Sequence, residues 1–260
     1  MPTFLRRIAP LTALLIAINV ALYLWQIATG ISPTDPELDD LARWGANISA
    51  LTLTGDSWRL LTSMFLHIGA LHLLLNMVSL LFLGTVAERN FGKINFLIIY
   101  LLSGLGGSLM SAVWNARPAG ESMAAMTSAA PTVYLVVSAG ASGAVMGLAA
   151  ASIVLKLLAL ARREYLPMPF SGKELAILVA INVVYGWQTN GTDNACHIGG
   201  LIAGAIVGLL LGAVRNQHAT VRGLAQAVVL VAGIAGTFVV AQSNASRDDL
   251  QQIRQQLEED

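Results

Sequence analysis

Three of the hydrophobic segments in this chain begin with polar residues that could carry out chemistry together. Ser142 lies in the sequence GASG, His197 begins the sequence HIGG, and His72 precedes Asn76 by four residues. A neutral imidazole can remove the proton of a serine hydroxyl while the oxygen attacks a carbonyl carbon. Polar groups inside membrane segments are costly, so they are candidates for a functional site. These residues indicate nucleophilic catalysis if the fold brings them together.

The composition indicates a membrane protein. The chain has 260 residues, of which 55% are hydrophobic and 12% are charged, and its mean hydropathy is +0.67. These values lie outside the usual range for a soluble domain. The formal net charge is zero, and no basic tail for nucleic acid is visible. Because Cys196 is the single cysteine, an internal disulfide and a multi-cysteine metal site are excluded.

Apolar segments long enough to cross a bilayer recur along the chain. They predict an all-α, polytopic membrane helix bundle with seven spans, at about 8–28, 67–86, 94–114, 140–159, 174–189, 197–214 and 223–242. The fifth span is the shortest, and Asn182 and Gln188 interrupt it. The first span could instead be a signal peptide, but it is long for one, contains Asn19 and Trp25, and lacks a small-x-small cleavage site.

The distribution of basic residues predicts a cytoplasmic N-terminus. With that orientation, ten of the 15 Lys and Arg residues fall on the inside, in agreement with the positive-inside rule. The inside set comprises Arg6, Arg7, Arg89, Lys93, Lys156, Arg162, Arg163, Lys173, Arg215 and Arg222. The loop at 29–66 and the polar tail after Ser243, which we expect to be helical, then lie outside.

Spans two, four and six all run from outside to inside in this topology. His72, Asn76, Ser142 and His197 therefore lie together in the outer half of the membrane, with His72 and Asn76 on one helix face. His67 lies off that face, and we expect it in the surface loop. Small residues at four-residue spacing let membrane helices approach closely; they are Gly143 and Gly147 on span four and Gly200, Gly204, Gly208 and Gly212 on span six.

Over residues 57–212, these motifs resemble those of rhomboid intramembrane serine proteases. The matching residues, in order, are Trp58-Arg59, His67-x4-His72-x3-Asn76, Gly140-x-Ser142-Gly143 and His197-x2-Gly200-x3-Gly204. The resemblance implies a cytoplasmic N-terminus at 1–7 and a six-helix rhomboid core at 8–214. A seventh transmembrane helix at 215–242 and a polar C-terminal tail at 243–260 would follow.

The resemblance also implies a mechanism and partners. Ser142 would be the nucleophile and His197 the general base, while His72, Asn76 and the Ser142 backbone N–H would form the oxyanion hole. The substrates would be membrane-anchored proteins, cut within or beside a transmembrane segment in the lipid bilayer. No cofactor, metal or nucleic acid is expected. The short loops favour a bacterial cytoplasmic membrane, and the sequence sets neither the substrate nor an oligomeric state.

The sequence also supports expectations for the outer loop, for the segment before Ser142 and for Trp187. Trp58-Arg59 should shape the outer loop, and the apolar stretch Tyr134-Leu135-Val136-Val137 should dip into the membrane above Ser142. Trp187 is predicted to anchor the membrane interface, although it could line a substrate gate.

Two positions near the expected dyad differ from the family's pattern. Met146 stands where the family usually has an aromatic residue against the catalytic histidine, and a thioether can still contact the imidazole. Cys196 stands where a small residue is usual, and we expect it to act in packing.

Two alternative functions make different demands on the sequence. An inactive rhomboid-like protein could bind transmembrane clients without cutting them, but such relatives typically lack the serine or the histidine, and both are present here. A small transporter would show paired broken helices in repeated halves and charges near mid-membrane. Neither feature is visible in the sequence.

Overall fold

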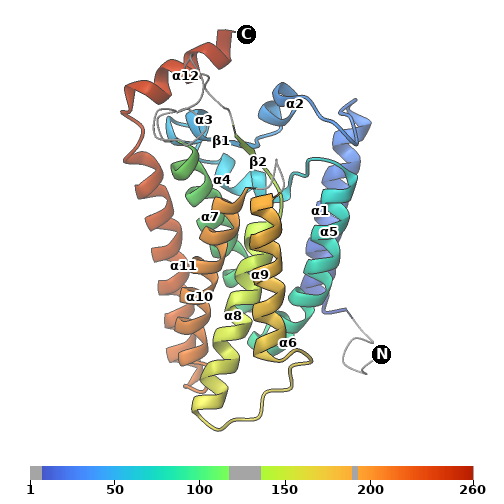
Figure 1. Ribbon diagram of the computed structural model, residues 1–260. Helices are drawn as coiled ribbons and strands as arrows, with labels where there is room; N and C mark the ends of the chain where they lie inside the picture. The colour runs from blue at the N-terminus through green and yellow to red at the C-terminus, as the bar shows by residue number, and fades with distance from the viewer. Residues whose placement is uncertain (1–7, 117–135, 189–192, 260) are drawn as a thin grey trace.

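Long, nearly parallel helices form the body of the molecule (Figure 1). The computed structural model describes residues 8–116, 136–188 and 193–259. Within them, six helical segments are long and apolar enough to cross a membrane. They are α1 (Pro10–Ala28), the continuous segment Ala70–Phe91, α7 (Lys93–Asn115), α8 (Ser142–Ala161), α10 (Asn194–Ala213) and α11 (Ala219–Gln242). The predicted helical membrane bundle is confirmed.

The second of these segments is built from three consecutive helical pieces. They are α5 (Ala70–Ser79), the π-helical turn η3 (Leu80–Gly84) and α6 (Thr85–Phe91). The predicted fifth span is a helix, α9 (Gly172–Gln188), of 17 residues, and it is not among the six apolar segments of membrane-spanning length. The seventh crossing therefore stays a prediction. Trp187 belongs to α9, but its side chain lies outside the described part of the chain.

Short elements gather at one end of the bundle, which we call the outer end. They are α2 (Leu38–Arg43), β1 (Asn47–Ile48), α3 (Ser49–Leu53), α4 (Arg59–Thr62), the 3-10 turn η2 (Ser63–Phe65), β2 (Val137–Ser138) and α12 (Asp248–Glu259). The helix α1 begins at the opposite, inner end (Figure 1). The strands β1 and β2 pair antiparallel, Asn47 with Ser138 and Ile48 with Val137.

The helices α7, α8 and α10 form the closely packed centre of the bundle. A β-carbon at Gly200 would lie 2.1 Å from the carbonyl oxygen of Gly143, and one at Gly204 would lie 2.3 Å from Cα of Gly147. Since no side chain fits at either position, the two backbones can touch along the glycine repeat. The predicted packing of spans four and six is confirmed.

A buried carboxylate ties α1 to the second membrane segment at the inner end. Oxygens of Glu88 accept hydrogen bonds from the backbone N–H of Leu11 at 3.1 Å and of Thr12 at 2.8 Å. The Thr12 hydroxyl donates to the same carboxylate at 2.9 Å. A negative charge is favourable at a helix N-terminus, where backbone N–H groups lack partners within the helix. Glu88 therefore orients α1 against the rest of the bundle.

The tail beyond Ser243 contains the predicted surface helix. This helix, α12, packs against α3 of the outer loop, and its Leu250 side chain is buried. The Arg254 guanidinium forms an ion pair with Asp56 at 3.4 Å and donates to the Thr54 hydroxyl at 3.3 Å. The C-terminal segment therefore covers part of the loop between α1 and α5.

Candidate active site

Ser142 is the first residue of α8, and a tight turn delivers it there. The turn centres on Gly140, whose φ of +129° is a conformation that side-chain-bearing residues rarely adopt. Its N–H donates to the carbonyl oxygen of Ser63 at 2.8 Å, which fixes the turn to η2. Ser142 therefore lies at the helix N-terminus, near the outer end of the bundle. It is half-buried.

His72 and Asn76 face this turn from α5. A β-carbon at Gly140 would lie 2.7 Å from Cε1 and 2.9 Å from Nε2 of His72, and 3.5 Å from Nδ2 of Asn76. The Asn76 amide also donates to the carbonyl oxygen of His72 at 3.1 Å, one helical turn earlier. The two side chains therefore share a face, as their spacing predicts, and both contact the backbone next to Ser142.

His67 lies in the loop before α5, as expected, but it is not at the surface. His67 is buried, and its ring centroid lies 5.3 Å from that of His72. The reason is local: Gly69, with a φ of +93°, immediately precedes α5 and turns the segment before it back toward the helix. His67 thus packs behind His72, a position that helical spacing did not reveal.

His197 lies in the first turn of α10 and is buried. Asp193 caps this helix by accepting a hydrogen bond from the Cys196 N–H at 3.0 Å. Among the described residues, Nδ1 of His197 has no hydrogen-bond partner.

The helix ends that carry Ser142 and His197 are in contact. A β-carbon at Gly143 would lie 2.9 Å from Sγ of Cys196 and 3.3 Å from its carbonyl oxygen. Gly143 directly follows Ser142 in the sequence, and Cys196 directly precedes His197. The structure thus brings the start of α8 against the start of α10, while His72 and Asn76 reach the same turn from α5.

Part of the segment leading to Ser142 is a strand and not an irregular loop, and its expected dip into the membrane stays a prediction. Val137 belongs to the strand β2, whose partner β1 lies in the outer loop between α1 and α5. Strand pairing satisfies the backbone groups that an apolar loop would leave open. Tyr134 and Leu135 lie outside the described residues.

A polar network joins this outer loop to α7 beneath the Gly140 turn. The Asn47 amide donates to the carbonyl oxygen of Ser108 at 2.8 Å, and the hydroxyls of Ser63 and Ser108 are 3.3 Å apart. All three residues are buried. Sequence reasoning missed Asn47 and Ser63, because isolated polar residues in a loop carry no spacing signal.

Arg59 organises the outer loop, as predicted for the Trp58-Arg59 pair. Its guanidinium donates to the carbonyl oxygens of Ala42 at 2.6 Å and Ala46 at 3.3 Å. It also pairs with Asp56 at 3.1 Å and lies 4.7 Å from the centre of the Trp58 ring. One buried cation therefore connects the segment after α2 to α4.

Cys196 and Met146 are both buried. The Cys196 sulfur sits between α7 and α8, since β-carbons at Gly107 and Gly143 would lie 3.2 and 2.9 Å from it; its predicted packing role is confirmed. Met146 is one turn after Ser142 on α8, and its contact with His197 stays a prediction. Within the described residues, no three His, Cys, Asp or Glu side chains form a group that could hold a metal ion.

Comparison with known proteins agrees with this arrangement. Residues 54–214 match the family model of the rhomboid domain. The chain is 39% identical over 206 residues to rhomboid protease AarA of Providencia stuartii, covering 76% of this chain and 71% of that protein.

A second bacterial relative matches nearly the whole chain. Rhomboid protease GluP of Bacillus subtilis is 33% identical over 248 residues, which are 95% of this chain and 43% of the relative. RHOMBOID-like protein 2 of Arabidopsis thaliana is 38% identical over 161 residues, which are 62% of this chain and 44% of that protein.

The family match covers α4 to α10, the segment that carries Ser142, His197, His72 and Asn76. The long apolar helices make the chain an integral membrane protein. With these helices and the aligned relatives, the chain belongs to the rhomboid family.

Proposed function

We propose that this protein is an intramembrane serine endopeptidase that cleaves membrane-anchored proteins within or next to a transmembrane segment. The observation that carries the proposal is the convergence of three helices near Ser142: α5 brings His72 and Asn76 to the Gly140 turn, and the start of α10, with His197, packs on α8 at Gly143. Two of the aligned relatives are named rhomboid proteases. The catalytic residues would be Ser142 and His197, with His72 and Asn76 in the oxyanion hole.

His197 would act as the general base. In the neutral form, its imidazole takes the proton of the Ser142 hydroxyl as the oxygen bonds to the substrate carbonyl carbon. Since Nδ1 has no hydrogen-bond partner among the described residues, a two-residue dyad fits this site better than a triad with an orienting carboxylate. The packing of α8 on α10 through Gly143 and Gly200 would hold the two groups at a constant separation.

Three donors could stabilise the negative charge on the tetrahedral intermediate. The Ser142 N–H begins α8, where backbone N–H groups are free of helical partners and the helix dipole is positive. His72 and the Asn76 amide approach the same turn from the opposite side. Donors arranged in advance around the developing charge usually supply the largest single part of such catalysis.

The remaining steps return the enzyme to its starting state. His197 gives its proton to the leaving amine as the C–N bond breaks, which leaves an acyl group on Ser142. A water molecule then attacks this ester while His197 takes its proton. The carboxylic acid product leaves as Ser142 regains its hydrogen.

The proposal includes a place and an orientation. The short loops favour a bacterial cytoplasmic membrane, and the excess of Lys and Arg in the inner segments favours a cytoplasmic N-terminus with the Ser142 site toward the outside. The core would extend over 8–214, with α11 as an added seventh span and residues 243–260 as an outer tail.

A fluorophosphonate probe tests the activated serine. We expect the purified wild-type protein to be labelled and the Ser142→Ala and His197→Ala variants to lose at least 99% of labelling, because either change removes one member of the dyad. The matched control is Ser152→Ala. Ser152 is buried on the same helix and donates to the Leu148 carbonyl oxygen at 2.7 Å, so its loss should leave labelling unchanged.

Cleavage of a single-span membrane protein in liposomes provides the second readout. The wild type should cut it, and the Ser142→Ala variant should not. A folded wild type that neither reacts with the probe nor cuts any single-span substrate would contradict the proposal and favour an inactive client-binding protein.

A further inference from the structure

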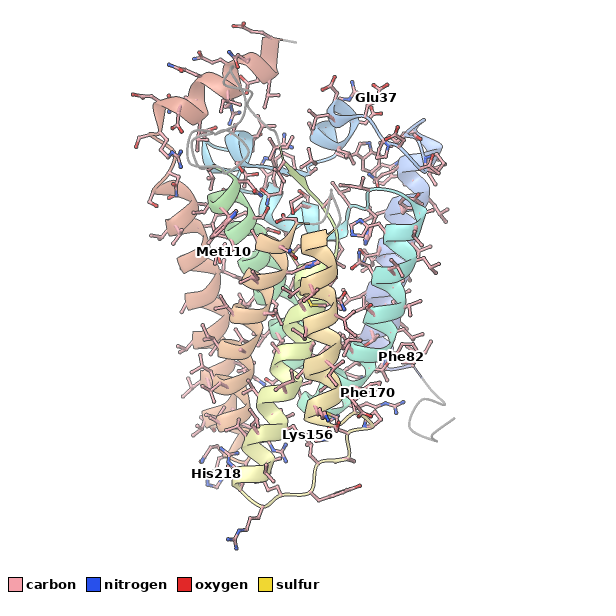
Figure 2. All side chains as sticks on the ribbon, in the orientation of Figure 1. Glu37, Phe82, Met110, Lys156, Phe170 and His218 are labelled. Atoms are coloured by element: carbon pink, nitrogen blue, oxygen red, sulfur yellow. The ribbon has the colours of Figure 1, made fainter. Side chains whose placement is uncertain are left out.

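A cavity of about 670 Å³ opens at the inner end of the bundle, far along the helices from Ser142. Its wall consists of the junction between α6 and α7, the connection from α10 to α11, and the first turns of α11. His218, which immediately precedes α11, is labelled at this end in Figure 2, together with Lys156. The volume falls within the range of small-molecule sites.

The lining of this inner cavity is basic and rich in amides. Lys93, Arg215 and Arg222 line it, and no acidic residue is among its lining residues. Arg215 pairs with Glu164 at 2.8 Å. Within the described residues, neither Lys93 nor Arg222 forms an ion pair with a carboxylate. Two positive charges are therefore available to an anionic ligand.

Amide groups add neutral donors and hold the wall together. Asn95 of α7 and Gln226 of α11 are joined by a hydrogen bond of 2.8 Å across the cavity wall. The helices α7 and α11 both begin at the cavity, and neither has a side chain capping its first turn. Helix N-termini favour anions. Together with the cations, they create a positive field inside the cavity.

The surface beside the cavity is apolar. Ile94, itself a lining residue, is exposed. Leu97 and Leu101 follow Ile94 at spacings of three and four residues, so they continue its face of α7, and both are half-buried. This face of α7 borders the cavity, and its exposed part meets lipid chains in a membrane. A ligand that joins an anionic head to an apolar chain matches both surfaces.

We propose that the inner cavity binds the phosphate headgroup of an anionic phospholipid, with an acyl chain along the Ile94 face of α7. Lys93 and Arg222 would contact the phosphate, since guanidinium and ammonium groups are the usual phosphate donors in proteins. Basic pockets between helices on the cytoplasmic side are suited to anionic lipids. The inference goes beyond the proposed peptidase activity and does not depend on Ser142 or His197.

Native mass spectrometry of the full chain in detergent, titrated with phosphatidylglycerol, tests the site. We expect the double variant Lys93→Gln/Arg222→Gln to bind this lipid about tenfold more weakly than the wild type does, because two phosphate partners are lost. The matched control is Arg163→Gln/Lys173→Gln. It removes two exposed cations outside the cavity lining and should bind like the wild type.

Three outcomes would overturn the proposal. One is equal affinity in the wild type and the cavity variant, and another is an equal loss in the cavity variant and the control. The third is equal binding of phosphatidylglycerol and the zwitterionic phosphatidylcholine by the wild type.

A competition experiment on the wild type separates a lipid from a free phosphate and needs no variant. Inorganic phosphate and glycerophosphate carry the same charged group without an acyl chain. If the acyl chain lies on α7, neither should displace phosphatidylglycerol at equal concentration. Displacement at equal concentration would instead assign the cavity to a soluble phosphate compound and contradict the lipid assignment.

Discussion

Gly140 combines two requirements at a single residue. Its φ of +129° is rarely adopted by residues with a side chain, and its Cα lies so close to His72 that a β-carbon would be 2.7 Å from Cε1. Glycine meets both requirements because it has no β-carbon. The separation between the α5 side chains and the Ser142 turn therefore depends on this one position.

Gly140→Ala should reduce substrate cleavage and probe labelling at least tenfold while the helices stay folded. The new methyl group would push His72 away from the turn, in addition to a backbone strain of about 1–2 kcal/mol. The measurements are cleavage rate and thermal unfolding.

Gly30→Ala is the matched control for backbone strain. Gly30 also has a positive φ, of +98°, but a β-carbon there would meet no atom within 4 Å beyond its chain neighbours. Its substitution should lower stability slightly and leave cleavage unchanged. Equal losses of cleavage in both variants would mean that strain alone, and not the contact with His72, is responsible.

The burial of His67 beside His72 could not be predicted from the spacing of the two residues. Helical spacing from His72 applies only within a helix, and α5 begins at Ala70, after Gly69. The turn at Gly69 brings the His67 ring to 5.3 Å from the His72 ring. Gly69 lies between the two histidines, and glycine adopts both positive and negative φ. The sequence therefore does not predict how His67 and His72 lie relative to each other.

At the scale of elements, α12 connects the C-terminus to the loop that supports the site. Arg254 reaches Asp56, and Asp56 also pairs with Arg59 at 3.1 Å, so one carboxylate links the tail to α4. The same loop contains β1, which pairs with β2 just before the Gly140 turn. The tail is thus connected to the candidate site through a short series of contacts.

Arg254→Ala should loosen this outer loop. We expect amide hydrogen exchange in residues 49–62 to rise several-fold, since the ion pair with Asp56 and the hydrogen bond to Thr54 are lost. The melting temperature should fall by only a few degrees, because partly exposed ion pairs contribute about 0.2–1 kcal/mol each.

Gln255→Ala serves as the control for this change, since Gln255 is the exposed neighbour of Arg254 on α12. Its exchange pattern should match that of the wild type. Unchanged exchange in 49–62 after loss of Arg254 would show that the apolar contact of Leu250, and not the ion pair, holds α12 in place.

At the scale of the whole molecule, α12 and the Ser142 site share one end, and the inner cavity lies at the other. The positive-inside rule predicts that the cavity end faces the cytoplasm. Cys196, the single cysteine, is buried. A cysteine introduced at an exposed position can therefore report which side of the membrane that position faces.

An impermeant maleimide should label Ser246→Cys, but not Ser171→Cys, in intact bacterial spheroplasts. Both positions are exposed, and they lie beside α12 and before α9, on opposite ends of the bundle. Lysed membranes provide the control, since both variants should then react. Labelling of Ser171→Cys alone before lysis would reverse the proposed orientation.

The helical membrane class, the positions of most spans, and the candidate residues Ser142, His197, His72 and Asn76 could all be predicted from the sequence. Such features depend on local properties: the length of apolar segments, their charged flanks, and four-residue spacing. They also made the glycine contacts between α8 and α10 predictable, because small residues at this spacing have few other uses in a membrane.

Contacts between distant groups, in contrast, became visible in the folded structure. The pairing of β1 with β2, the approach of Ser63 to Gly140, the burial of His67, and the docking of α12 all join segments that are far apart or separated by a turn. The inner cavity likewise takes its basic residues from two separate connections. Contacts of this kind depend on how helices pack and where turns reverse the chain, and local residue patterns do not encode them.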